Sequence, residues 1–195
     1  MIWSPSADRG DQPAVTICGA LDAARIADVL ARFGVTGIAL AGAQAIPGSY
    51  WGAPEAGLVG DRLYYRPDTP VHSLLHELAH YVCMDPVRRA GLDTDAGGSD
   101  EEECAVCYLE VLLAGYLPPF DPDRCLADMD AWGYSFREGT ACAWFVGDGS
   151  DARAWLGAHG LIGADGLPTW RKLGSEPFSQ VGGRAPFLRR ALTPT

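Results

Sequence analysis

The run His76-Glu77-Leu78-Ala79-His80 lies in a segment whose residue pattern predicts a helix. Two histidines separated by four positions project from one face of a helix, about one turn apart. Both imidazole rings can then reach a single metal ion, and the glutamate beside the first histidine can hold a water molecule at that ion. The spacing therefore predicts a metal site whose first two ligands are His76 and His80.

The helix that carries this run is predicted from its apolar residues. Thr69 is a candidate N-cap, and Pro70 suits the first helical position. The histidines fall on the opposite side from the apolar residues and so face either solvent or a cleft. His72 lies one turn before His76 and could approach the same site, although a surface histidine in the first turn is the simpler interpretation. The apolar residues that share one side of the helix are Val71, Leu74, Leu75, Leu78 and Val82.

A third ligand must come from another part of the chain, because a catalytic zinc needs three protein ligands and one open position. The extended motif with a third histidine is excluded, since Cys83 and Pro86 stand where that motif requires glycine and histidine. An acidic run at residues 100–103 opens a second predicted helix. It offers a carboxylate as the third ligand.

Within this acidic run, Glu102 falls in the middle of the apolar stripe of the second helix. Glu103 falls with Glu110 on the side that looks exposed to solvent, and Glu101 lies at the edge of the stripe. A carboxylate on a buried face is costly unless something neutralises it, and a metal would do so. We therefore predict Glu102 as the third ligand, with Glu103 and then Glu101 as alternatives. An acidic first turn favoured by the helix dipole would explain Glu101 and Glu103 without a metal.

The two motifs together resemble those of the gluzincin zinc metallopeptidases, and their short spacing is similar to that of the compact ImmA/IrrE-like minimal gluzincins. The resemblance covers residues 20–116, and the chain is also similar to uncharacterised proteobacterial proteins. In the minimal gluzincins the second motif reads approximately E-x-x-A-N-x-F-A-x-x-L-L. Val106 replaces its asparagine and Leu109 its second alanine. The positions that match, with tyrosine for phenylalanine, are Glu102, Ala105, Tyr108, Leu112 and Leu113.

This resemblance implies an α+β, zincin-like fold, in which a small, mostly antiparallel sheet packs on the H-E-x-x-H helix and a following glutamate-bearing helix. It implies one zinc ion per chain held by His76, His80 and Glu102. Glu77 would be the catalytic base in the hydrolysis of a peptide bond of a peptide or protein substrate. The alternative is a non-catalytic zincin-fold protein with a structural zinc or a peptide-binding cleft.

The rest of the chain is predicted from periodicity and turn residues. A hairpin at 57–66 leads directly into the histidine helix, and its edge strand could pair with an extended substrate. Residues 86–99 are predicted to form a solvated loop. The remaining predicted elements are helices at 20–33, 122–132 and 151–159, and strands at 35–40 and 141–146.

Further site residues are predicted more loosely. Asp85 could orient a ligand histidine or simply stand at the end of a helix. Cys104 and Cys107 form a C-x-x-C pair that core packing explains best. A hydrogen-bond donor should also stabilise the oxyanion of the reaction. His159 is one candidate, although a positive charge near a helix C-terminus is the simpler role for it. The candidates are Tyr50, Tyr64, Tyr65, Tyr134 and His159.

Composition limits the function further. The chain of 195 residues suffices for one full-sized core, predicted as a single domain at 1–165 followed by a Gly/Pro/Arg-rich extension at 166–195. The net charge of −10 argues against nucleic-acid binding. There is no signal-like start and no apolar run long enough to cross a membrane, so a cytoplasmic protein without membrane contact is expected. The sequence does not indicate the oligomeric state.

Overall fold

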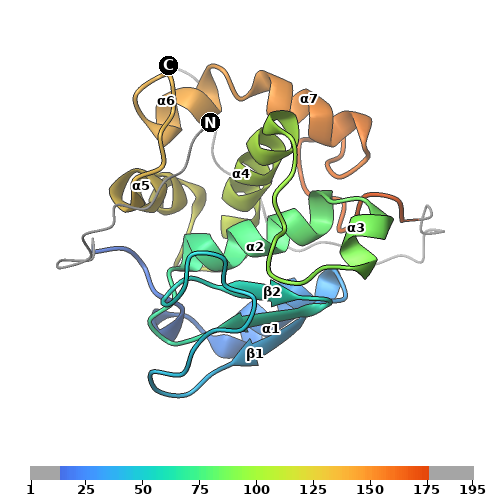
Figure 1. Ribbon diagram of the computed structural model, residues 1–195. Coiled ribbons are helices and arrows are strands. Elements are labelled where there is room, and N and C mark those ends of the chain that lie inside the picture. The colour runs from blue at the N-terminus through green and yellow to red at the C-terminus, as the bar shows by residue number, and fades with distance from the viewer. Residues whose placement is uncertain (1–13, 176–195) are drawn as a thin grey trace.

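The computed structural model describes residues 14–175, and this part of the chain has the predicted α+β composition (Figure 1). Its secondary structure combines one short 3-10 helix and seven α-helices with a single three-stranded sheet. In chain order the elements are η1 (Cys18–Ala20), α1 (Ala23–Arg32), β1 (Thr36–Ala39), β2 (Gly57–Val59), β3 (Arg62–Tyr65), α2 (Val71–Cys83), α3 (Pro86–Ala90), α4 (Asp100–Ala114), α5 (Pro122–Trp132), α6 (Ala141–Val146) and α7 (Ser150–Ala158).

The sheet has the strand order β1-β3-β2. The predicted hairpin is confirmed, because β2 and β3 pair antiparallel with Leu58 opposite Leu63. However, β1 pairs with β3 in parallel, so the sheet is mixed and not mostly antiparallel. The reason is the long connection at 40–56, which carries the chain across to the far edge before β2 begins.

The outer edge of β2 is covered by the chain itself. The backbone of Gly60 donates to the carbonyl of Leu92 at 2.9 Å, and Thr94 donates to the carbonyl of Leu58 at 3.2 Å. We refer to residues 92–98 as the strap. The edge that the sequence suggested for substrate pairing is thus occupied by the strap, and the segment predicted as one loop at 86–99 contains the helix α3.

Helix α2 lies between the sheet and α4, and α4 to α7 are gathered above α2 in Figure 1. Helix α1 packs against β1, with Leu30 beside Gly37. The N-cap of α2 is Pro70, one residue later than predicted, because the Thr69 hydroxyl accepts instead from the backbone of Arg66. The apolar side of α2 is buried as expected. The opposite side is buried too, since α4 packs against it.

The core continues beyond the segment that the family resemblance covers. Phe120, Met129 and Leu156 are buried with the residues of α2 and α4 in one hydrophobic cluster. The segment predicted as a strand at 141–146 is the helix α6, because the Thr140 hydroxyl accepts from the backbone of Ala143 and so caps a first helical turn.

The predicted extension begins within the packed body. The Trp170 ring lies 5.3 Å from that of Phe33, and the backbone of Leu173 donates to the carbonyl of Val82 at 2.9 Å. Residues 166–175 therefore pack against α1 and α2, whereas 176–195 lie outside the described residues. None of the helices within residues 14–175 has the length and apolar character needed to cross a membrane.

Candidate metal centre

The two motif histidines meet at the face of α2 that packs toward α4. Their Nε2 atoms are 3.1 Å apart, and their rings lie edge to face. Two nitrogen ligands of one tetrahedral zinc would stand about 3.3 Å apart, given a zinc–nitrogen bond of about 2.0–2.1 Å. The buried Nδ1 of His80 has no hydrogen-bond partner among the described residues. His76 and His80 are thus already close to the spacing that a shared ion requires.

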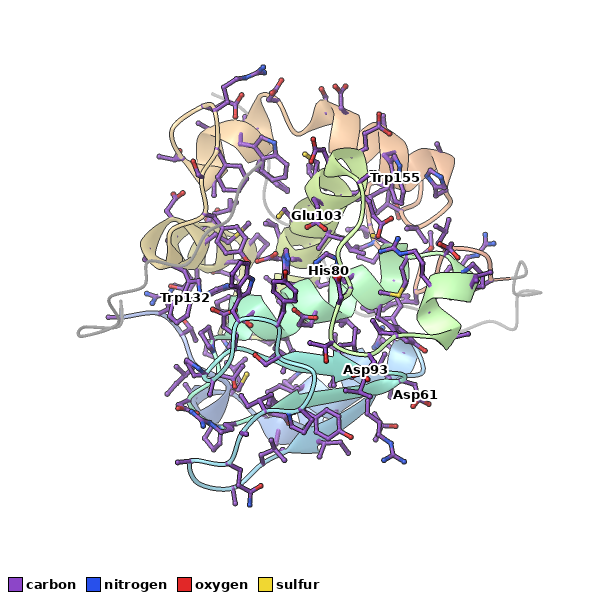
Figure 2. The ribbon with its side chains drawn as sticks, in the orientation of Figure 1. Asp61, His80, Asp93, Glu103, Trp132 and Trp155 are labelled. Atoms are coloured by element: carbon purple, nitrogen blue, oxygen red, sulfur yellow. The ribbon has the colours of Figure 1, made fainter. Side chains whose placement is uncertain are left out.

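The carboxylate that joins them is that of Glu103. Its Oε2 lies 3.6 Å from His80 Nε2, and Figure 2 shows its side chain reaching from α4 toward His80. One donor atom from each of His76, His80 and Glu103 falls within 4.8 Å of the other two. The second carboxylate oxygen of Glu103 accepts from the backbone of Gly98 at 2.9 Å, which ties the strap to the site.

Glu102, the ligand preferred from the sequence, has a different partner. Arg88 Nη1 donates to both of its carboxylate oxygens, at 2.9 and 2.8 Å. Glu102 is buried as its place in the apolar stripe indicated, but an arginine and not a metal neutralises it. The structure therefore brings the alternative, Glu103, to the histidines. Sequence reasoning missed this because Arg88 lies on α3, in a segment predicted to be loop.

Glu110 is a site residue that sequence reasoning missed. It is fully buried, and its Oε2 lies 2.9 Å from His76 Nδ1. The side of α4 that looked exposed to solvent faces α2, so Glu103 and Glu110 both point at the histidines. Burial alone would lower the pKa of His76, but hydrogen bonds with Cys107 and Glu110 raise that pKa well above its ordinary value. A carboxylate at the far ring nitrogen fixes the orientation of a ligand histidine.

Cys107 belongs to this inner part of the site as well. Donor atoms of His76, Cys107 and Glu110 form a second group within 4.8 Å of one another. The prediction of core packing for Cys107 agrees with its burial, but the residue also contacts His76. Of these three residues, His76 and Cys107 line the neighbouring cavity and Glu110 does not.

A cavity of about 370 Å³ opens beside the histidine pair and is lined in part by His76, His80 and Glu103. Glu77 lines it too. Burial raises the pKa of Glu77 to about 8, an effect that nearby His76 opposes and nearby Glu55 reinforces. A carboxylate with a pKa near neutrality can both take up and release a proton at neutral pH, as a general base must.

The structure separates the predicted oxyanion donors. Tyr50 and Tyr134 line the cavity, and the Tyr134 ring centre is 5.9 Å from that of His76. Tyr64 and Tyr65 lie on β3, outside the described lining of the cavity. His159 lies at the end of α7, where its ring centre is 4.0 Å from that of Trp155 and its Nδ1 lies 2.8 Å from the Trp155 carbonyl oxygen.

Asp85 stands at a helix end, the second of its two predicted roles. Its Oδ1 accepts from the backbone of Val87 and Arg88 and caps α3. It therefore does not orient a histidine, a role that Glu110 holds instead. Asp85 acts on the site only through α3, which carries Arg88.

His72 is buried and does not lie on the surface as expected. It is 1% exposed, lines the cavity, and packs edge to face against Trp132 and Tyr134. Burial, helped by nearby His76, lowers its pKa to about 3, so the ring is neutral. Neither ring nitrogen has a hydrogen-bond partner among the described residues.

Comparisons of the chain with protein-family models, with curated proteins and with solved structures give no match. Membership of the gluzincin family therefore stays a prediction from the two motifs. The function proposed below rests on the arrangement of the described residues.

Proposed function

We propose that this protein is a zinc-dependent metallopeptidase with a zincin-like arrangement of sheet, α2 and α4. His76, His80 and Glu103 would hold one zinc ion per chain. The observation that carries the proposal is the convergence of three donor atoms within 4.8 Å at the wall of a cavity that Glu77 also lines. A peptide or protein chain is the proposed substrate.

The residues at this position fit zinc. Two imidazole nitrogens and one carboxylate oxygen form a donor set that zinc accepts, and three protein ligands leave one position open. Zinc bound there would supply Lewis-acid chemistry, which polarises a carbonyl group and acidifies water. Glu110, through its contact with His76 Nδ1, sets the ring orientation that presents Nε2 to the ion.

Glu77 would carry out the proton transfers. It would take a proton from the attacking water and later pass it to the leaving amine. Its place at the cavity wall, next to His76 in the sequence, suits it to both steps. Tyr134 is the proposed donor to the oxyanion, because its ring lies beside that of His76 at the cavity wall.

The test is Glu77→Gln, which keeps the size of the side chain but removes the base. We expect wild type and variant to bind one zinc each, and the variant to cleave a diverse peptide pool at least about 100-fold more slowly. Metal analysis and mass spectrometry of the products measure both quantities. Glu101→Gln, an exposed position in the first turn of α4, is the matched control. Equal turnover by Glu77→Gln and wild type would reject the mechanism.

A non-catalytic zinc protein is the second candidate, and one observation favours it. The strap pairs with the outer edge of β2, where an extended substrate would be expected to add as a strand. The same peptide pool distinguishes the two candidates. Cleavage that a chelator abolishes supports the peptidase, whereas stoichiometric zinc without any cleavage supports the binding protein.

A further inference from the structure

The cavity extends past the metal centre toward the N-terminal end of α2. His72 lies one turn before His76 on the same face, about 6 Å along the helix axis. It shares the cavity wall there with Glu55, Ser73 and Trp132. A neutral imidazole carries one donor and one acceptor, and buried polar atoms are normally hydrogen-bonded. The ring of His72 has neither partner within the described residues, which points to a ligand in this part of the cleft.

Aromatic rings enclose this part of the cavity. Trp132 and Tyr134 pack edge to face on His72, with ring centres 5.4 and 5.6 Å away. Tyr50 and Trp51 form an exposed edge-to-face pair at the rim, with ring centres 4.9 Å apart. Aromatic faces attract cations, and the attraction grows when water is excluded.

The described cavity wall is rich in acidic side chains. Its carboxylates are those of Glu55, Glu77, Asp95 and Glu103, and no lysine or arginine stands among its lining residues. Glu55 and Asp95 do not belong to the metal-binding group. Glu55 is 6% exposed, with Oε1 3.4 Å from Trp132 Nε1, so its charge acts where little water screens it.

We propose that the cavity around His72 and Glu55 is a subsite for a cationic side chain of the substrate, a guanidinium or an ammonium group. This inference rests on the proposed function, because it defines the substrate class of the same cleft. Glu55 would attract the charge, His72 would accept a hydrogen bond, and Trp132 would pack on the aliphatic stem. An acidic side chain would be repelled by the same wall. Since the subsite lies one helical turn from the metal centre, the cationic residue would be next to the cleaved bond.

The first experiment compares peptides that differ only in charge. The zinc-loaded protein is given acetyl-Ala-Ala-X-Ala-Ala-amide, where X is arginine, lysine, citrulline, leucine or glutamate. We expect kcat/KM for arginine and lysine to exceed that for citrulline by at least about tenfold, with the cut beside X and with glutamate slowest. Citrulline has nearly the shape of arginine without its charge. Equal rates for arginine and citrulline would overturn the subsite.

The second experiment measures binding without cleavage, so that the subsite and the proposed function can fail separately. Zinc-loaded Glu77→Gln is titrated with the arginine and citrulline peptides by calorimetry. We expect the arginine peptide to bind at least about tenfold more tightly. If the wild type cleaves no peptide but the Glu77→Gln variant still prefers the arginine peptide, the subsite is supported and the peptidase is rejected. Equal affinities, or no binding of the arginine peptide, overturn the subsite.

A variant assigns the preference to the residue. Glu55→Gln should bring the ratio of arginine to citrulline affinity close to one, and Glu101→Gln should leave the ratio unchanged. Circular dichroism and zinc content establish that each variant is folded. If Glu55→Gln does not fold, the arginine–citrulline comparison in the other proteins still decides the proposal. A folded Glu55→Gln variant with the full preference would overturn the role of Glu55.

Discussion

Glu102 and Glu103 are neighbours in the sequence, yet each has its own function in the structure. Successive residues of a helix point about 100° apart, so the two carboxylates cannot face the same partner. Glu103 reaches His80 across the gap between α4 and α2, and Glu102 turns to Arg88 on α3. A shift of one position along α4 therefore decides which carboxylate joins the candidate metal centre.

Paired substitutions at these two residues test that assignment. Glu103→Gln should weaken zinc binding by more than the roughly 10- to 100-fold that loss of an orienting residue costs, because a ligand itself is lost. Glu102→Gln should leave zinc affinity within about threefold and lower the free energy of unfolding by about 1 kcal/mol, since its ion pair is partly exposed. Competition with a chelator and urea unfolding give the two quantities. The reverse pattern would restore Glu102 as the ligand.

His72 makes the stability of the metal-free protein depend on pH. Its pKa is about 3 when folded and 6.5 by reference, so in acid the unfolded chain binds a proton that the folded chain does not. The contribution of His72 is complete above pH 6.5 and is lost as the pH falls toward 3. Between about pH 7 and pH 5 the loss is about 2 kcal/mol.

Removing the ring isolates this effect. Urea unfolding of metal-free wild type and His72→Gln at the two pH values should show that wild type loses about 2 kcal/mol more than the variant. Identical losses would mean that the folded protein can protonate His72, which its burial opposes.

At the scale of single residues, the sequence predicts which residues take part in the site better than it predicts which way their side chains point. His76, Glu77 and His80 come together as expected because their spacing lies within one helix. Glu110 is predicted on a solvent-facing side, because a helical wheel of α4 alone does not show which neighbouring helix covers each side. Glu102 and Glu110 are buried on two sides of α4, because α3 provides Arg88 to the first and α2 provides His76 to the second.

Helix α3, which the sequence pattern did not predict, connects the candidate metal centre to the strap. Two adjacent arginines leave it in different directions. Arg88 bonds Glu102 and the carbonyls of Ala96 and Gly97, whereas Arg89 bonds backbone carbonyls that include those of Tyr81 and Leu173. Arg88 therefore fixes the strap, and Arg89 fixes the end of α2 and the segment around Leu173.

This division predicts opposite outcomes for two otherwise similar variants. Arg88→Ala should speed hydrogen exchange in the strap and weaken zinc binding by about tenfold, because Gly98 donates to Glu103 from that segment. Arg89→Ala should lower the free energy of unfolding while zinc affinity stays unchanged. Exchange mass spectrometry and chelator competition measure these effects. Equal effects of both variants on zinc affinity would show that the strap does not position Glu103.

Elements with strong periodicity were predicted, and short ones were not. α2, the hairpin of β2 and β3, and α5 follow from apolar spacing and turn residues. α3 and α6 span only five and six residues, too few for a helical period to appear above chance. The parallel pairing of β1 with β3 depends on contacts distant in sequence, so no local pattern could indicate it.

On the scale of the whole molecule, residues 166–175 of the described chain pack against α1 and α2. Trp170 anchors this segment: its ring packs on Phe33, and the Arg32 guanidinium lies 4.4 Å from its centre. The segment predicted as the start of an extension is thus part of the structure that supports the histidine helix.

Truncation of this anchor should destabilise the protein without touching the site. Trp170→Ala should lower the free energy of unfolding by about 2 kcal/mol, less than for a fully buried tryptophan because the side chain is only partly enclosed. Leu167→Ala, at an exposed position of the same segment, should change it by less than about 0.5 kcal/mol. Urea unfolding measures the free energy of unfolding of both variants. Equal values for Trp170→Ala and wild type would show that Trp170 does not anchor this segment.

The hydrogen bonds from the strap to β2 also bear on colloidal behaviour. An open strand edge is a template on which a second molecule can add, and such growth leads to insoluble aggregates. Because residues 92–94 already occupy part of that edge, two folded copies cannot join there strand to strand. Any change that frees the strap would therefore lower solubility, which turbidity on storage would reveal.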